Sequence, residues 1–253
     1  MPDLPNVCVL SDPDHLARAA AELFIRSAQA AIQDRGSFSV MLSGGSTPTT
    51  LYRLLAEPDN AAQIFWKQVH VFWGDERCVP PDHPDSNYRL AHETLLGRVP
   101  LPPHHIHRIP AEHAPAEAAA HYEADLVAYL RAAAPGHLRL FDLTLLGLGE
   151  DGHTASLFPG SRALKETSRL VTANLIPSRN EWRVTLTVPA LNYLSDQILF
   201  LVSGADKADV LNRVLCGPFD PAALPAQAIR PLSGRVMWLV DAQAAKVLPP
   251  ISL

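Results

Sequence analysis

An aspartate and a histidine share one glycine-rich turn, and they are the residues in this sequence best suited to proton transfer. Asp151 and His153 lie in GLGEDGH, residues 147–153. An imidazole titrates near neutral pH, and a neighbouring carboxylate can orient the ring and stabilise its cation. Each residue also has a purely structural interpretation. Asp151 could cap the short helix that is expected before Pro159, and His153 could be an ordinary surface or core residue.

Three further segments carry groups that suit an anion. They are SGGSTP (43–48), GDER (74–77) and SGADK (203–207). A Gly-Gly turn that opens a helix leaves backbone N–H groups at the positive end of the helix dipole, which favours phosphate. Arg77 and Lys207 add positive charge, and Asp75 adds a second carboxylate for acid–base chemistry. Taken singly, each has a structural alternative as a turn, a cap or a solvated side chain.

The residues before each segment form an apolar run typical of a buried strand. Expected strands are residues 7–10, 37–42, 69–73, 141–146, 170–173, 183–188, 197–202 and 236–240. Expected helices are residues 13–35, 49–56, 87–96, 116–134, 190–194 and 206–215, with Asp12, Ser46 or Thr47, and Ser86 as caps and residues 98–114 as a loop. This alternation predicts an α/β fold with a mostly parallel, doubly wound sheet and helices on both faces. We find no linker and expect a single domain over residues 1–253.

Because the carboxyl ends of parallel strands lie along one edge of the sheet, the four chemical segments are expected to meet there. The predicted site grips a phosphate group and performs acid–base chemistry on the rest of the molecule.

Composition excludes several classes of partner. The formal net charge is −5 and there is no long basic run, so nucleic acid and anionic membrane are poor partners. Three widely spaced cysteines suit a reducing compartment, and the start of the chain does not resemble a signal peptide. No apolar run approaches the length of a membrane span. We expect a cytoplasmic protein that is a monomer or a small homo-oligomer.

Four patterns are misleading. Residues 147–152 match GxGxxG, the pattern of dinucleotide-binding turns. The next expected strand does not end in the acidic residue that would bind the ribose, so we do not expect a dinucleotide here. The histidines at 104, 105 and 107 lie in a proline-rich loop without metal-ligand spacing. A Ser-His-Asp hydrolase would need Ser43 or Ser46 as its nucleophile, but neither serine lies in the GxSxG motif that presents such a nucleophile. Cys78 has no neighbouring base, so we expect no catalytic role for it.

The sequence resembles the 6-phosphogluconolactonase family, within a wider group that includes glucosamine-6-phosphate deaminases. The resemblance covers nearly the whole chain and rests on residues 42–55, 72–96, 143–160, 183–192 and 203–211. It implies a NagB/RpiA-like α/β sheet, hydrolysis of a sugar phosphate lactone, no organic cofactor and no obligatory metal. The segments Asp75-Glu76-Arg77 and 155–159 (ASLFP) resemble the lactonase pattern rather than the deaminase pattern.

The resemblance also implies roles for individual residues. His153 is similar to the catalytic histidine, and Asp75 and Asp151 are similar to the site carboxylates, either of which could orient the imidazole. The phosphate-binding set that it implies is Gly44, Gly45, Ser46, Thr47, Arg77 and Lys207, with Arg183 as a further site arginine. Two alternatives stay open: an amino-sugar-phosphate deaminase and a non-catalytic sugar-phosphate sensor.

Overall fold

The computed structural model describes residues 6–133 and 139–250 of the chain. Its strands are β1 (Val7–Leu10), β2 (Phe38–Leu42), β3 (Val69–Trp73), β4 (Asp75–Arg77), β5 (Ile106–His107), β6 (Phe141–Leu146), β7 (Val171–Ile176), β8 (Glu181–Leu186), β9 (Ser195–Val202) and β10 (Arg235–Asp241). Its α-helices are α1 (Pro13–Arg35), α2 (Ser46–Leu55), α3 (Pro58–Ala61), α4 (Asn87–Thr94), α5 (Pro115–Ala133), α6 (Val188–Leu194) and α7 (Ala208–Cys216).

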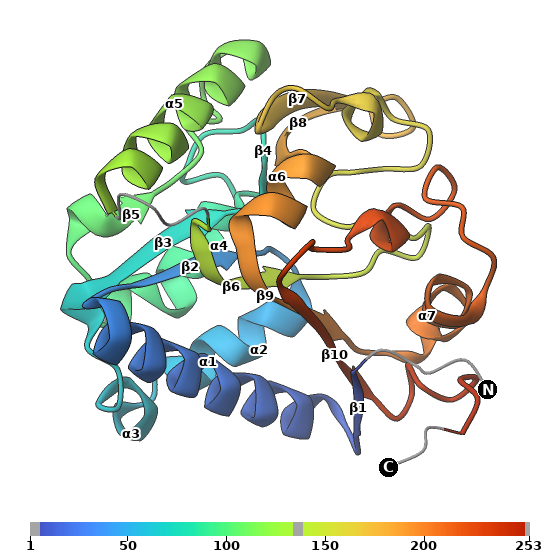
Figure 1. The fold of residues 1–253 in the computed structure, drawn as a ribbon, viewed down its shortest axis with the longest axis horizontal. Coiled ribbons are helices and arrows are strands. Elements are labelled where there is room, and N and C mark those ends of the chain that lie inside the picture. The colour runs from blue at the N-terminus through green and yellow to red at the C-terminus, as the bar shows by residue number, and fades with distance from the viewer. Residues whose placement is uncertain (1–5, 134–138, 251–253) are drawn as a thin grey trace.

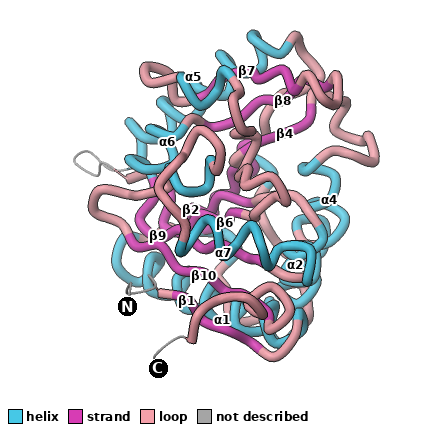
Figure 2. Tube along the Cα trace, turned by 90° about the vertical axis from the view of Figure 1, so that its right-hand side faces the viewer, coloured by secondary structure: helices cyan, strands magenta, loops and turns pink. Residues whose placement is uncertain are grey.

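A seven-stranded parallel sheet forms the centre of the molecule, in the order β1-β10-β9-β6-β2-β3-β5. The side chains of β2 are all buried, and those of β6 are nearly all buried, as expected for strands covered on both faces. Figure 1 shows α1 along one face of the sheet and α5 and α6 on the other side, and Figure 2 shows the same layers from the side. The predicted parallel α/β sheet with helices on both faces is confirmed.

A second, three-stranded antiparallel sheet has the order β4-β8-β7. Two predicted strands, 170–173 and 183–188, exist as β7 and β8, but they lie in this small sheet and not in the central one. After β3 the chain continues as β4, a strand that the sequence did not predict, and β4 pairs with β8. Apolar alternation predicts an extended strand but leaves its pairing partner open, because pairing depends on segments distant in sequence.

Helix α1 shows how well local signals place helix ends. Asp12 caps it by accepting a hydrogen bond from the His15 amide, and Gly36 ends it in the left-handed conformation with φ of 80°. Ser86 caps α4 as predicted, since its side chain accepts a hydrogen bond from the Arg89 amide. The predicted end of α5 at Ala134 falls outside the described residues.

The first turn of helix α2 differs from the prediction. Its N-cap is Gly45, with no side-chain hydrogen bond to the helix, so the predicted cap at Ser46 or Thr47 is wrong. Both residues already belong to the helix. The first amides of α2 therefore have no partner in their own helix, which preserves them for a ligand.

The short helix predicted between His153 and Pro159 does not form. Thr154 and Leu157 make an isolated antiparallel bridge, and Ala155 has a φ of 47°, which no right-handed helix accepts. The Asp151 carboxylate accepts a hydrogen bond from the His153 amide across a local turn. The interpretation of Asp151 as a helix cap is therefore wrong, and the side chain closes a turn that holds the histidine.

Strands β9, β6, β2 and β3 are consecutive neighbours in the sheet. Their carboxyl ends lead into the segments 203–207, 147–153, 43–48 and 74–77 respectively. The four chemical segments consequently lie along one continuous part of the sheet edge. No helix within the described residues is both long and apolar enough to cross a membrane.

Candidate active site

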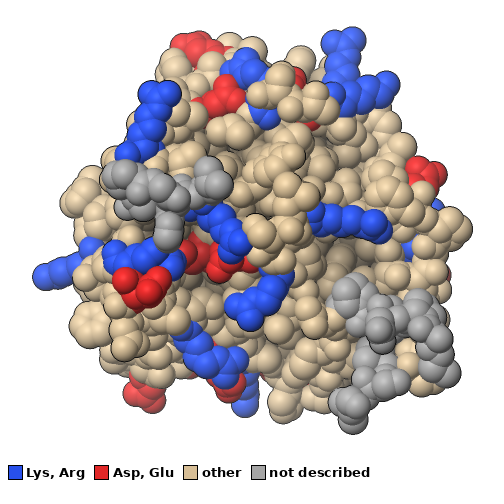
Figure 3. All heavy atoms as spheres, in the orientation of Figure 1, with Lys and Arg blue, Asp and Glu red and all other residues tan. Residues whose placement is uncertain are grey.

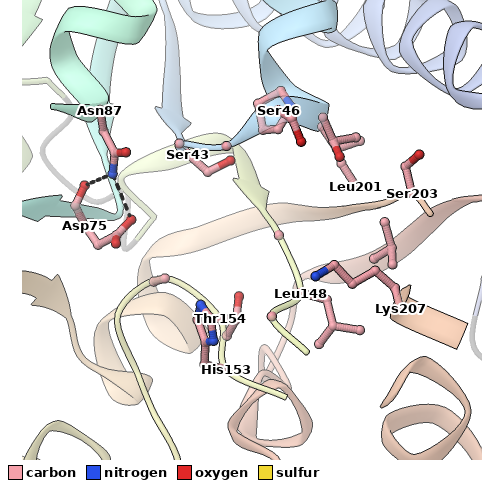
Figure 4. Close-up of a pocket in the computed structure, with 18 of the residues that line it drawn as sticks. Ser43, Ser46, Asp75, Asn87, Leu148, His153, Thr154, Leu201, Ser203 and Lys207 are labelled. Carbon is pink, nitrogen blue, oxygen red and sulfur yellow. Dashed lines mark hydrogen bonds between the residues drawn. The ribbon is translucent and has the colours of Figure 1, made fainter. Parts of the chain in front are cut away.

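A pocket of about 270 Å³ opens at this edge of the sheet (Figure 4). All the residues singled out in the sequence line it except Asp151: Gly44, Gly45, Ser46, Thr47, Asp75, Arg77, His153, Arg183 and Lys207. Asp151 lies behind the imidazole of His153 and contacts it directly. The predicted convergence of distant segments on one pocket is thus present in the structure.

His153 is fixed from two directions. Its Nδ1 hydrogen-bonds Asp151 Oδ1 at 2.5 Å, and its ring stacks on Phe158 with 4.1 Å between ring centroids. A Cβ on Gly149 would lie 2.0 Å from Nδ1, so a glycine is required where the imidazole packs against the turn. The described residues offer no hydrogen-bond partner to Nε2, which leaves that nitrogen for a ligand or water in the pocket.

The sequence left open which carboxylate orients the histidine, and the structure gives that contact to Asp151. Burial alone raises the pKa of Asp151, but the hydrogen bonds and the charge of His153 outweigh it and lower the pKa below its ordinary value. Asp151 is therefore ionised at neutral pH. An ionised carboxylate at Nδ1 favours the tautomer whose Nε2 can accept a proton.

The amino end of α2 forms one wall of the pocket. Gly45 has φ of 111° and ψ of 172°, a conformation that side chains strongly disfavour, and it turns the chain into the helix. Tyr52, in the second turn of α2, accepts a hydrogen bond from the Ser43 amide and donates one to the Ser43 carbonyl. The turn is thus tied to its own helix, and the amides of Ser46 and Thr47, at the first turn of the helix, have a geometry suited to an anion.

Three cations line the pocket. Lys207 projects into it in Figure 4, with Nζ 3.0 Å from Asp206 and 3.6 Å from Glu150. Arg77 and Arg183 lie directly opposite each other on the paired strands β4 and β8. Arg183 is paired with the carboxylate of Glu181, and Arg77 donates to the Asp85 carbonyl. Both side chains line the pocket, and guanidinium groups are donors that suit a phosphate.

Asp75 is buried and is not hydrogen-bonded to His153; its hydrogen-bond partners are neutral donors. Ser156 donates to Asp75 Oδ2 at 2.6 Å, and Asn87 donates to its carbonyl at 3.0 Å and to Oδ1 at 3.4 Å. Sequence reasoning missed Asn87 and Ser156, although Asn87 lines the pocket. One signal for them is present in the sequence: Asn87 lies in SNYRL and Ser156 in TASLF, within segments already noted as motifs. Nothing local shows that they contact Asp75, because Asp75 belongs to another segment.

The patterns set aside in the sequence lie elsewhere or lack partners. His105 and His107 pack with His70 at the β3–β5 edge. Within residues 6–133 and 139–250, no group of three His, Cys, Asp or Glu side chains is placed to hold a metal ion. Burial, with the charge of Glu76, raises the pKa of Cys78 to about 11, which opposes a nucleophilic role. Neither Ser43 nor Ser46 hydrogen-bonds His153 in the described structure.

Known proteins resemble this chain over almost its entire length. A curated 6-phosphogluconolactonase of Nostoc sp. is 41% identical over 244 residues, covering 96% of this chain and 98% of that protein. The 6-phosphogluconolactonase of Synechocystis sp. is 41% identical over 247 residues, covering 97% and 99%. A solved structure of 6-phosphogluconolactonase from Trypanosoma cruzi has a TM-score of 0.84 and 29% identity, and covers 99% of both chains.

The family comparison agrees with these relatives. Residues 11–238 match the family described as glucosamine-6-phosphate isomerases/6-phosphogluconolactonase, and this span contains every residue that lines the pocket. The chain belongs to the glucosamine-6-phosphate isomerase/6-phosphogluconolactonase family.

Proposed function

We propose that this chain hydrolyses 6-phospho-D-glucono-1,5-lactone to 6-phospho-D-gluconate, the activity for which its curated relatives are named. One observation carries the proposal. A histidine with Nδ1 held by a carboxylate and Nε2 unpartnered faces the same pocket as three cations and the amino end of α2. This arrangement combines a base with an anchor for a distant phosphate.

The proposed chemistry needs a base, a well-placed water and stabilisation of the tetrahedral oxyanion, but no covalent intermediate, because a δ-lactone is already an activated ester. His153 Nε2 takes a proton from the water that attacks the lactone carbonyl. Asp151 holds Nδ1 and stabilises the imidazolium that forms. The same proton then returns to the ring oxygen as its bond to the carbonyl carbon breaks, so the histidine ends neutral.

Phosphate anchoring decides where the carbonyl lies. The amides at the start of α2 and the side chains of Lys207, Arg77 and Arg183 hold the phosphate, and the sugar extends from it toward His153. Fixing a reactant in this way supplies much of the rate acceleration, since the attacking water and the base no longer have to find it.

Asp75 binds the sugar hydroxyls in this proposal and takes no part in the proton transfer. A carboxylate has about four lone-pair sites, and among the described residues two side chains donate to it. The remaining sites on this buried group can accept hydrogen bonds from hydroxyl groups of the ring.

The test is direct assay of acid release. The purified protein is added to freshly prepared 6-phosphogluconolactone in a pH-stat, with spontaneous hydrolysis subtracted. We expect turnover far above that background, and none of the ammonia release from glucosamine 6-phosphate that a deaminase would give. Binding of 6-phosphogluconate by calorimetry without lactone turnover would instead identify a sensor and overturn the proposal.

A further inference from the structure

The side chain of Asn87 touches two parts of the pocket at once. It is the first residue of α4 and is only 2% exposed. Its amide nitrogen donates to the carbonyl and the carboxylate of Asp75, as the dashed lines in Figure 4 show. Ser156 donates to the other carboxylate oxygen, so that the orientation of the carboxylate is fixed from two sides.

The oxygen of the same amide packs against Gly44 in the phosphate-binding turn. A Cβ added to Gly44 would lie 1.9 Å from Asn87 Oδ1 and 2.5 Å from its Cγ. The backbone of Gly44 has an ordinary negative φ, so the requirement for glycine comes from this contact and not from the backbone conformation. The distance between the turn and Asp75 is therefore set by the width of one amide group.

Asn87 is itself held firmly. The Glu76 carboxylate accepts hydrogen bonds from the amides of Asn87 and Tyr88, each at 2.8 Å, and from the Ser86 hydroxyl at 3.0 Å. Glu76 is the neighbour of Asp75 on β4, and its side chain points to the start of α4. Strand β4 and the first turn of α4 consequently form one unit, and Asn87 cannot shift without disturbing both.

We propose that Asn87 is a positioning residue that sets the separation between the Asp75 carboxylate and the phosphate-binding turn at Gly44. The ligand it serves is a phosphorylated sugar lactone held at both ends, with the phosphate at the turn and ring hydroxyls on Asp75. The proposal rests on the function proposed above. It adds that selection for the length and shape of this ligand depends on a residue that need not contact it.

A mutant cycle between positions 44 and 87 tests the contact. Gly44→Ala is expected to raise KM for the lactone at least tenfold, because the new methyl collides with the Asn87 amide. Asn87→Ala removes all three atoms that the methyl would meet. The double variant should therefore have the kinetics of Asn87→Ala alone. If Gly44→Ala were as harmful in the Asn87→Ala protein as in the wild type, the proposed contact would be wrong.

A second cycle tests positioning of the carboxylate. Asn87→Ala is expected to lower kcat/KM about tenfold in the wild type but less than twofold in an Asp75→Ala protein, since no carboxylate remains to be held. Equal losses in both backgrounds would overturn the proposal. Asn87→Leu, which is uncharged, has roughly the size of asparagine and cannot donate a hydrogen bond, provides the same comparison if the alanine variant folds poorly.

Asn192→Ala is the matched control. The Asn192 side chain likewise makes two hydrogen bonds, donating to the Ala228 carbonyl at 2.9 Å and accepting from the Arg230 amide at 2.8 Å, but it lies outside the pocket. Its kinetics should equal those of the wild type. A wild type without lactone turnover would contradict the proposed function, and both cycles would then be measured as affinity for 6-phosphogluconate, which still decides the role of Asn87.

Discussion

At the scale of single residues, His153 combines restraint with access. Asp151 and Phe158 fix its ring on one edge and one face, while Nε2 is left without a partner among the described residues. Preorganisation of this kind removes the need to reorient the base during the reaction. The role proposed for His153 depends on Nε2 and not on the ring alone.

His153→Asn should therefore lower kcat by about 10²–10⁴-fold, the usual contribution of a general base, with little change in KM. Steady-state kinetics with the lactone measure both constants. His121→Asn, which alters an exposed histidine on α5, is the control and should behave as the wild type. Wild-type turnover by the His153→Asn variant would exclude His153 as the base.

Lys207→Ala should act mainly on KM. Its ammonium is among the cations proposed to hold the phosphate, and losing a hydrogen bond to a charged group costs about 1.5–3 kcal/mol, or roughly tenfold or more in affinity. The same kinetic measurement applies, with the exposed Lys165→Ala as the matched lysine control. An unchanged KM would remove Lys207 from the proposed phosphate site.

At the scale of elements, the start of α2 depends on a backbone conformation that only glycine adopts readily. Gly45→Ala should cost about 1–3 kcal/mol of strain or shift the turn, and so raise KM for the lactone. Gly36→Ala is the control, because Gly36 also has a positive φ but ends α1 away from the pocket. It should lower the melting temperature and leave KM unchanged; equal KM effects at both positions would contradict the prediction.

The β3–β5 edge contains a cluster of histidines that should make stability depend on pH. His70 Nδ1 lies 3.3 Å from His107 Nε2, and its ring stacks on His105. Burial, followed by the charges of the neighbouring histidines, lowers the pKa of His70 from 6.5 to about 4. The other groups at this edge are His104, Tyr129 and Asp125, which contacts His107.

Because the unfolded chain protonates His70 at a higher pH than the folded protein does, stability is fully present above about pH 6.5 and is lost as pH falls toward 4. His70→Phe keeps an aromatic ring but cannot bind a proton. Its melting temperature should fall less steeply between pH 7 and 4.5 than that of the wild type. His121→Gln should keep the wild-type slope, and a wild-type slope in His70→Phe would contradict the prediction.

At the scale of the whole molecule, an acidic protein presents a local cationic site. The net charge is −5, and on the face drawn in Figure 3 basic and acidic side chains are interleaved. The pocket brings together Arg77 and Lys207, which are 130 residues apart in the sequence, so its cations come together only in the folded chain. A phosphorylated ligand should therefore bind the folded state alone.

Such a ligand stabilises the fold by mass action. At 100 times its dissociation constant, 6-phosphogluconate should add about 2.7 kcal/mol, which for a chain of this size is a rise of about 5–10 °C in melting temperature. Thermal unfolding with and without the ligand measures the shift. Gluconate without phosphate should give a much smaller one at equal concentration, and equal shifts from the two compounds would contradict phosphate anchoring.

Most of the elements and most of the site were predictable from local sequence. Asp12, Gly36 and Ser86 define helix ends through contacts with residues a few positions away. The four chemical segments could be placed together because parallel strands bring their carboxyl ends to one edge. The prediction of a helix after His153 was wrong because tertiary contacts override the local pattern there. One such contact is the hydrogen bond that the Ser156 amide donates to the Thr185 hydroxyl.

The sequence by itself determined which chemical groups the protein has and which end of each strand presents them. Residue type and chain direction follow directly from the order of the amino acids. Tertiary structure alone decided that β9, β6, β2 and β3 are neighbours, that Asp151 and not Asp75 holds His153, and that Asn87 separates Asp75 from Gly44. Those facts depend on hydrogen bonds and close contacts between distant segments, which exist only once the chain has folded.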